Sequence, residues 1–558
     1  MFKQRCFRLL LLASAIATSL SAAAYDFESA GIYYNITGNN TVEVTYSDRD
    51  NNTYSGSISV PETVTNNGTE YSVTKIGEYA FQGSAVTSVS MPECITSIGQ
   101  YACNECGSLE TVVLPTNLDD FSGWCIFRNC RNLKNIAIPE NVTEIPNGTF
   151  INCSSLAAIT IPHGVSEIGS NAFYGCSSLT SIEIPEGVEY LYEQVFYGCT
   201  ALESVKLPQN LLQIGNYCFD GCSSLESVTI PEGVTTIGDY AFYGCNLNAL
   251  TLPESLTTLG SNAFYSCKSL KTIKIPSGVT TIHYQCFNGC SSLESVTIPE
   301  GVTAIEAYAF GSCNLNALKL PESLTTLGSN AFESCKSLKT IKIPSGVTTI
   351  PDQCFDGCSS LESVTIPEGV TDIGASAFRF CNLNALTLPE SLTTLGSNAF
   401  KSCKSLKTIK IPSGETTIPD KCFDGCSSLE SVTIPEGVTT IGGYAFYISN
   451  LNALTLPESL TTLGDRAFSG CKNLESVTLP ESLTILGDYA FENCKSLKAV
   501  KIPSGVTAIP GRCFRECSSL KSVTIPEGVT DIGVAAFYTC IYNHRTTKTN
   551  QKYPSVNL

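Results

Sequence analysis

The sequence of 558 residues predicts a repeat solenoid, in which equivalent coils are stacked and each contacts only its neighbours. An Ala-Phe pair and its flanking residues return every 22 or 23 residues. Each copy holds one short β-branched segment that ends at a proline, and it has too few apolar residues to fold alone. Stacking would place each apolar side chain on its copy in the next coil and so form a continuous core.

The aromatic residue of the pair, called the anchor here, defines the register. The series contains 21 anchors and 20 intervals between Phe81 and Phe537, and only Cys103 departs from phenylalanine. A solenoid of this kind has equivalent surfaces in every coil. Function is therefore expected on an extended face.

One unit shows the expected order of elements. Leu225 to Ile230 (LESVTI) is predicted to be a strand, and Pro231 ends it because proline cannot donate to a β-ladder. A Glu-Gly turn follows, and Val234 and Ile237 return to the core. The segment around Phe242 is expected to form a turn or a single helical turn.

The two ends of the chain lack the repeat. Residues 25–60 are predicted to form a β cap, in which IYYNIT and TVEVTY flank Gly38-Asn39-Asn40 as a hairpin that covers the open end. About twenty coils are expected over residues 61–540. The segment 541–558 is polar, basic and out of register, and we interpret it as an irregular tail.

Residues 1–24 have the features of a secretory signal. Lys3, Arg5 and Arg8 precede an apolar stretch, and Ala22-Ala23-Ala24 offers a cleavage site. The apolar run is too short for a stable membrane span, and none is expected elsewhere. The mature chain is therefore predicted to be secreted or held at the cell surface.

The net charge argues against two classes of partner. Removing the three basic residues of the signal changes the net charge from −18 to −21. A strongly acidic protein repels nucleic acids and anionic membranes, so neither is expected as a partner.

A longer period of 68 residues lies above the short one. The sequence CNLNAL begins at Cys245, Cys313 and Cys381, and SNLNAL begins at Ser449. Blocks of three coils are thus repeated almost without change from about residue 245.

The segment CSSLESVTIPEGVTTIGDYAF, Cys222 to Phe242, resembles the BspA-like leucine-rich repeats of bacterial surface proteins. The resemblance covers roughly residues 57–540. It implies a right-handed leucine-rich-repeat-like coil with a parallel sheet on the concave face and short turns, 3-10 or helical, on the other. It also implies a secreted or surface-attached protein. Some members of the family bind host extracellular proteins or other cells, and the family has no common catalytic residues.

The 28 cysteines are mostly a product of the repeat, because 19 of them follow an anchor by three residues. Copies ~4.8 Å apart with parallel side chains suit a ladder of buried thiols better than disulfides, which need a near-perpendicular twist. The C-x-x-C of Cys103 and Cys106 has no neighbouring ligand histidine, so we expect no metal site. Disulfide or metal binding is the alternative for a second set, one residue before the anchor: Cys218, Cys286, Cys354, Cys422 and Cys513.

Catalysis is not expected. The three histidines, His163, His283 and His544, fit no arrangement with a nucleophile, and glycine-rich phosphate loops are absent from the sequence. We predict neither an enzyme nor a cofactor.

Lysines at outward strand positions are the candidate ligand-binding residues. In-register stacking should pair Lys271 with Glu294 and leave Lys274 beside Thr297, without an obvious partner. The partnerless lysines would form a weakly basic stripe with one lysine every ~14 Å. The alternative is that these charges only stabilise the sheet and keep the protein soluble. The candidates are Lys271, Lys274, Lys339, Lys342, Lys407 and Lys410.

These observations favour a monomeric protein-interaction solenoid, an adhesin for host extracellular proteins or other cells. The alternative is a spacer whose length alone matters. Outward strand positions hold mainly Ser, Thr, Asn, Lys and Glu, so stacking of sugars on this face is not expected.

Overall fold

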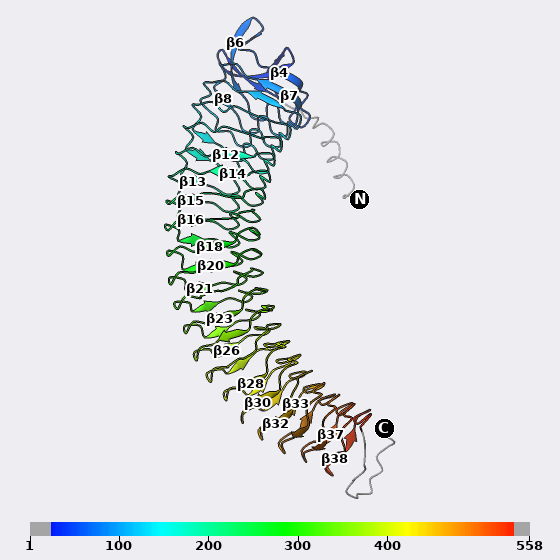
Figure 1. Ribbon diagram of the computed structural model, residues 1–558. Helices are drawn as coiled ribbons and strands as arrows, with labels where there is room; N and C mark the ends of the chain where they lie inside the picture. Colours follow the sequence, from blue (N-terminus) through cyan, green and yellow to red (C-terminus); the bar gives the residue numbers. More distant parts are fainter. Residues whose placement is uncertain (1–23, 541–558) are drawn as a thin grey trace, which may run out of the picture. The chain divides into compact units, whose positions relative to one another are not determined.

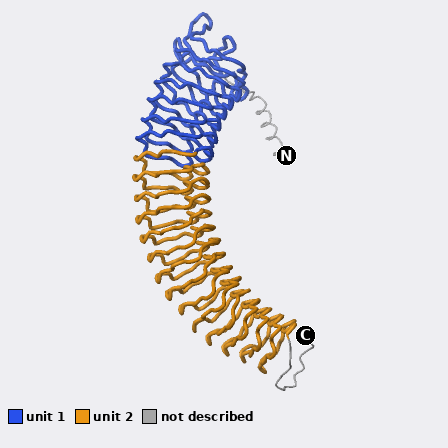
Figure 2. Tube along the Cα trace, viewed as in Figure 1, with its two compact units in different colours: residues 1–225 blue, residues 226–558 orange. Residues whose placement is uncertain are grey.

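The computed structural model describes residues 24–540, so the predicted signal and tail lie almost entirely outside the described residues. The chain divides into two compact units, Met1–Leu225 and Glu226–Leu558, which are coloured separately in Figure 2. Within residues 24–540 each unit consists of strands and turns and contains no helix. Of the alternatives expected around the anchor, the hydrogen-bonded turn is therefore the one that forms in the described residues.

The first unit begins with a mixed sheet. The predicted hairpin is confirmed, because β2 (Ile32–Gly38) and β3 (Thr41–Thr45) pair antiparallel. The sheet also contains β1 (Phe27–Ser29), β5 (Thr63–Asn66) and β6 (Thr69–Ile76). Strand β6 runs parallel to β3 and to β8 (Ser97–Ile98) of the first coils. The cap is therefore joined to the first coils by β-sheet hydrogen bonds.

The predicted strand forms in only part of the coils, where it builds parallel pairs and one set of three, called the long-strand ladder here (Figure 1). Leu225–Ile230 of the example unit forms no strand, and neither do the equivalent residues 248–251, 316–319 and 384–387. The register is as expected, with Lys274 opposite Thr297, Lys342 opposite Thr365 and Lys410 opposite Thr433. In unit 1 the ladder contains β4 (Ser55–Ser59), β7 (Ala85–Ser90), β9 (Thr111–Val113), β12 (Ser181–Glu183) and β14 (Ser204–Lys206). In unit 2 it contains β18 (Thr272–Lys274), β20 (Ser295–Thr297), β23 (Thr340–Lys342), β25 (Ser363–Thr365), β28 (Thr408–Lys410), β30 (Ser431–Thr433), β32 (Ala453–Thr455), β34 (Ser476–Thr478), β36 (Ala499–Lys501) and β38 (Ser522–Thr524).

A second parallel series, the short-strand ladder, was not predicted. It is built after the proline turns, from Thr-Thr-Ile and Thr-Thr-Leu segments in most coils of unit 2, and Ile282 of one coil lies opposite Ile305 of the next. In unit 1 it contains β8, β10 (Glu144–Ile145), β11 (Glu167–Ile168), β13 (Tyr190–Leu191) and β15 (Gln213–Ile214). In unit 2 it contains β16 (Thr236–Ile237), β17 (Thr258–Leu259), β19 (Thr281–Ile282), β21 (Ala304–Ile305), β22 (Thr326–Leu327), β24 (Thr349–Ile350), β26 (Asp372–Ile373), β27 (Thr394–Leu395), β29 (Thr417–Ile418), β31 (Thr440–Ile441), β33 (Thr462–Leu463), β35 (Ile485–Leu486), β37 (Ala508–Ile509) and β39 (Asp531–Ile532).

The anchors form the centre of the core. From Phe242 to Phe537 each ring stacks on the next with centroids 5.3 to 5.7 Å apart. Leu, Val and Ile of both ladders pack beside this column and are buried. The predicted continuous core is thereby confirmed.

The cysteine ladder is confirmed as a set of free thiols, nearly all of them buried. The structure adds a role that the sequence did not reveal. Each thiol donates to the backbone carbonyl of the anchor in the preceding coil, as from Cys290 Sγ to Phe264 O at 3.1 Å and from Cys358 Sγ to Phe332 O at 3.1 Å. The ladder therefore satisfies a buried acceptor in each coil. The second set, including Cys286 and Cys354, is also buried and free.

The third side of each coil is the turn around the anchor. We call the seven residues from four before to two after each anchor the turn face. Residues two before and two after the anchor have left-handed backbone, as in Tyr308 and Ser312, both with φ of 58°. This conformation points the N–H groups of Tyr308, Phe310 and Ser312 at carbonyls of the next coil, 2.7 to 3.0 Å away. The turns are thus hydrogen-bonded from coil to coil, as the strands are.

Candidate interaction surfaces

The six candidate lysines lie where the sequence placed them, on the outward side of the long-strand ladder. All six are exposed, and the strands that carry them alternate exposed and buried positions. Lys271 is also a backbone neighbour of Glu294, whose N–H donates to the Lys271 carbonyl at 2.9 Å. The expected register is therefore correct.

The expected charge pairing is wrong. Among the described residues no ion pair joins Lys271 to Glu294, and the equivalent lysines Lys339 and Lys407 also make none. Pairs of this type do form where the lysine belongs to the later coil, as in Lys498–Glu475 at 2.6 Å and Lys134–Glu110 at 2.8 Å. Lys271 precedes Glu294 instead, and the coil before it offers Asn248.

The lysines that were expected to lack partners are the paired ones. Lys342 Nζ lies 2.6 Å from Glu322 Oε1, and Glu322 belongs to the Pro-Glu-Ser turn of the preceding coil. The same pairing joins Lys274 to Glu254, Lys410 to Glu390 and Lys501 to Glu481. The prediction considered only in-register neighbours and missed this diagonal partner, 20 residues earlier in the chain.

Each of these glutamates joins two coils. Glu481 accepts from Lys501 and also from the backbone N–H and hydroxyl of Ser504, at 3.3 and 3.2 Å. The nearby ammonium group of lysine, with these N–H groups, lowers the pKa of Glu254, Glu322, Glu390 and Glu481 below the ordinary value. We call this arrangement the proline-turn latch. It neutralises Lys274, Lys342 and Lys410 as binding groups.

The short-strand ladder carries a row of threonines. In many coils the hydroxyl of the first threonine donates to the carbonyl of its copy in the preceding coil, at 3.1 to 3.3 Å, as from Thr325 to Thr303 and from Thr461 to Thr439. The recurring Thr-Thr-Ile segments are the sequence feature from which this row could have been predicted. The threonine hydroxyls on this side of the solenoid therefore form hydrogen bonds between coils.

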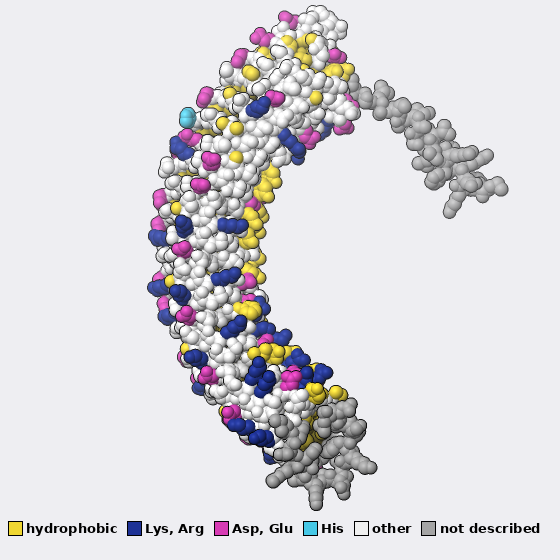
Figure 3. Space-filling model, turned by 45° about the vertical axis from the view of Figure 1, so that its right-hand side comes forward, with side chains coloured by type: hydrophobic (Ala, Val, Ile, Leu, Met, Phe, Trp, Pro, Cys, Tyr) yellow, Lys and Arg dark blue, Asp and Glu magenta, His cyan; other side chains and the backbone are white. Residues whose placement is uncertain are grey.

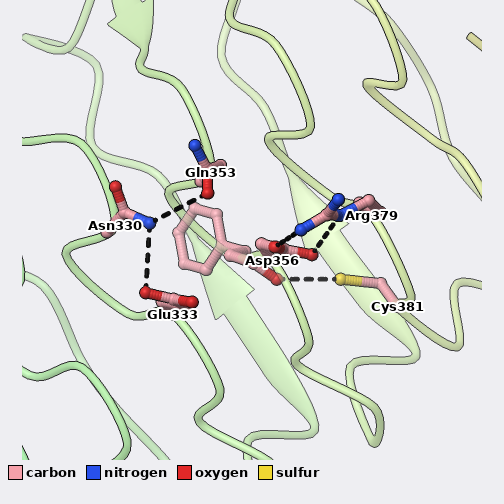
Figure 4. Close-up of polar contacts among 7 residues, drawn as sticks. Asn330, Glu333, Gln353, Asp356, Arg379 and Cys381 are labelled. Carbon is pink, nitrogen blue, oxygen red and sulfur yellow. Dashed lines mark hydrogen bonds and ion pairs between the residues drawn. The ribbon is translucent and has the colours of Figure 1, made fainter.

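The turn face of unit 2 carries a denser polar network (Figure 4). Arg379 donates to Asp356 of the preceding coil through Nε at 3.0 Å and Nη2 at 2.5 Å. The Asn330 amide donates to Glu333 at 3.1 Å and to Gln353 at 3.4 Å. Lys401 pairs with Asp424 at 2.8 Å. Sequence reasoning missed this face because it concentrated on the strands.

Cationic and aromatic side chains alternate two residues before the anchor in five successive coils: Lys421, Tyr444, Arg466, Tyr489 and Arg512. The Arg466 guanidinium lies 4.2 Å from the Tyr489 ring centroid and 5.5 Å from that of Tyr444. Arg512 lies 5.4 Å from the Tyr489 centroid. Such contacts hold the side chains in place from coil to coil.

The surface hollows of the described residues are shallow, and their linings offer no arrangement of catalytic groups. One of 460 Å³ in unit 2 is lined by Asp352, Asp372 and Thr394, among other residues without His or Cys. His163 is exposed in a turn, His283 contacts Glu306 at 3.3 Å, and His544 lies outside the described residues. Within residues 24–540 no group of three or more His, Cys, Asp or Glu could hold a metal ion.

Glu415 is the exception within the core. It occupies the position of Val279 and Val347 in the sister blocks and is only 3% exposed. Its Oε1 has no hydrogen-bond partner. Burial, with a smaller contribution from the negative charge of Asp372, raises the pKa of Glu415 to about 7.

The fold and its surfaces define a class of protein, a repeat solenoid built from two parallel ladders and a turn face. The model of the BspA type leucine rich repeat region matches residues 50–156, 123–228, 212–339, 325–452 and 439–553. The chain belongs to this family.

Solved structures of bacterial proteins are similar to this chain. A leucine-rich repeat protein from Bacteroides ovatus ATCC 8483 is 25% identical, covers 91% of this chain and 100% of its own, and has a TM-score of 0.31. A leucine rich cell surface protein from Faecalibacterium prausnitzii A2-165 is 25% identical over 89% of this chain and 94% of its own, with a TM-score of 0.28. No curated protein matches the sequence. No helix in the described part of the chain is long and apolar enough to cross a membrane.

Proposed function

We propose that this protein is a secreted or cell-surface adhesin that binds folded extracellular proteins of a host or of neighbouring cells. The observation that carries the proposal is the repetition of the same exposed side chains at the same register positions in successive 68-residue blocks. A partner with repeated features meets such a surface several times, and weak contacts then add through effective concentration. Membership of a leucine-rich repeat family and the signal-like residues 1–24 support this function.

On the long-strand ladder, Lys271, Lys339 and Lys407 are the lysines best suited to a partner. They are exposed and make no ion pair with a described residue, whereas Lys274, Lys342 and Lys410 are held in proline-turn latches. Their spacing of three coils, ~14 Å, lets one acidic protein surface engage two of them together.

The test measures binding of the mature chain to immobilised fibrinogen, laminin and collagen at low and at raised salt. Replacing Lys271, Lys339 and Lys407 together with serine is expected to weaken binding by about fivefold at low salt and less at high salt, since exposed charges contribute modestly and are screened. The matched control replaces Lys274, Lys342 and Lys410 with serine and should leave the affinity within about twofold.

Failure of the unmodified chain to bind any of these proteins would contradict the adhesin role and favour the spacer. Unchanged affinity in the Lys271, Lys339 and Lys407 variant would exclude these lysines as binding groups.

A further inference from the structure

The three duplicated blocks differ almost only on the turn face. Blocks 245–312, 313–380 and 381–448 differ at 13 of their 68 positions, and 10 of these 13 lie in the turn face, which supplies 21 of the 68. Tyr265, for example, is replaced by Glu333 and Lys401. Exposed strand positions such as Lys271 and Thr272 are identical in all three blocks. Solvent exposure alone therefore does not account for where the blocks diverge.

One of the divergent positions, the last of each block, exposes a large apolar side chain in two of the three blocks. Phe380 is 48% exposed and Ile448 is 46% exposed, and both lie two residues after their anchors. The same position holds Ser312 in the first block, and Gly244 lies 68 residues before Ser312, just outside the blocks. Ser402 and Gly425 occupy this position in the two coils between them, so the two apolar groups stand ~14 Å apart across small residues.

Neither residue suits its backbone. Phe380 has φ of 61° and Ile448 has φ of 57°. A left-handed conformation is unfavourable in a residue with a Cβ, and it is a genuine outlier for a β-branched side chain. Ile448 rests against Gly470 of the next coil, but it enters no core. The fold therefore loses stability to present these two groups to solvent, and backbone strain of this kind is typical of functional positions.

The surroundings of the two groups are those of a protein interface. The Arg379 guanidinium, which pairs with Asp356, lies 5.2 Å from the Phe380 ring centroid, and the Phe380 N–H donates to the Lys401 carbonyl at 2.8 Å. Tyr444 and Tyr447 lie near Ile448 in sequence, and Arg466 donates to the Tyr444 hydroxyl at 3.1 Å. In the lower half of Figure 3, hydrophobic side chains lie among both basic and acidic ones. Apolar anchors with Tyr, Arg and a balanced polar rim fit a folded protein rather than a polyanion.

We propose that the turn face of unit 2, anchored by Phe380 and Ile448, is the surface that recognises a folded protein partner with apolar pockets for these two side chains. This inference rests on the proposed function and places the selective contacts on the variable turns, while the strand lysines add the same weak contacts in every block. The turn residues that differ between blocks then set which partner is bound.

The test uses substitutions that the chain itself supplies. Phe380→Ser restores the residue of the first block, and Ile448→Gly introduces the residue found at Gly244, one period before Ser312. The double variant is compared with the native chain on immobilised fibrinogen, laminin and collagen. We expect Kd to rise at least about tenfold, as for loss of buried apolar anchors at an interface. Tm should be unchanged or higher, because the substitutions relieve left-handed strain. A merely structural role for the two side chains would lower Tm instead.

Ile485→Thr is the matched control. Ile485 is 56% exposed, lies on the short-strand ladder, and occupies the position of Thr462. This variant should bind like the native chain. The inference is overturned if Kd is unchanged in the double variant or if the control variant loses as much affinity as the double variant. It is also overturned if the native chain binds only heparin or a second copy of itself. Absence of native binding to any of the proteins contradicts the proposed function itself, and the inference falls with it.

Discussion

Several single residues in the turns adopt a left-handed backbone conformation that is unusual for their residue types. Tyr308, Gln353 and Arg466 all have positive φ, although only glycine and asparagine are usual there. The reason is the alternation of hydrogen bonds, since every second N–H of the turn must point to the next coil. The sequence could predict the anchor and its burial. It could not predict the left-handed residues, because the demand arises only when coils stack.

Glu415 gives the clearest prediction at this scale. Below the ordinary value of 4.5 the carboxyl is protonated in both the folded and the unfolded chain. As pH rises from there to about 7, the unfolded chain loses the proton while the folded chain retains it. The free energy of unfolding should therefore fall over this window, by about 3 kcal/mol, and stay level above it.

Glu415→Val is expected to remove this pH dependence and to raise stability at pH 8, where the sister residues Val279 and Val347 show that the site accepts valine. Urea unfolding at pH 4.5 and pH 8 measures the effect, and Glu415→Gln serves as a control that keeps a polar group without titrating. Equal pH dependence in the native chain and the valine variant would mean that Glu415 is not the responsible group.

At the scale of elements, each side of the coil has its own ladder of side-chain hydrogen bonds. Cysteine thiols donate to the anchor carbonyls, and threonine hydroxyls donate to backbone carbonyls beside the short strands. The proline-turn latches join the lysines of the long strands to glutamates of the preceding coil. The sequence predicted the long strand from its β-branched run and proline. It did not reveal the short strand, because two residues cannot show an alternating pattern. The lysine partners were misassigned for a related reason, since a long side chain reaches a turn as readily as a neighbouring strand.

The cysteine ladder is interrupted once after Cys106, at Ser449, and this position allows the role of the thiols to be tested. Ser449 is buried, and its hydroxyl has no hydrogen-bond partner. We expect Ser449→Cys to stabilise unit 2 by about 1 kcal/mol, because the longer thiol can reach the anchor carbonyl of the preceding coil and fills more of the core. The reverse substitution, Cys290→Ser, should destabilise by a similar amount. Thermal unfolding of both variants provides the measurement, and a fall in Tm for Ser449→Cys would show that the thiols do not act as proposed.

At the scale of the whole molecule, the period of the sequence predicted the solenoid and its core, but not which face varies. The 68-residue blocks repeat their strands and change their turns, as Ser312, Phe380 and Ile448 show. This difference becomes meaningful only once the structure assigns those positions to one side of the coil. Because each block is three complete coils, a block can be removed without loss of register.

Recognition by the turn face is tested by deleting residues 245–312, 313–380 or 381–448 and measuring Kd for the protein partner in each case. All three deletions remove the same strands and one set of strand lysines, but only the second removes Phe380 and only the third removes Ile448. We predict that loss of 245–312 changes Kd by no more than about twofold, whereas either of the others raises it at least about tenfold. Equal weakening by all three deletions would contradict recognition by the turn face and would return binding to the repeated strands.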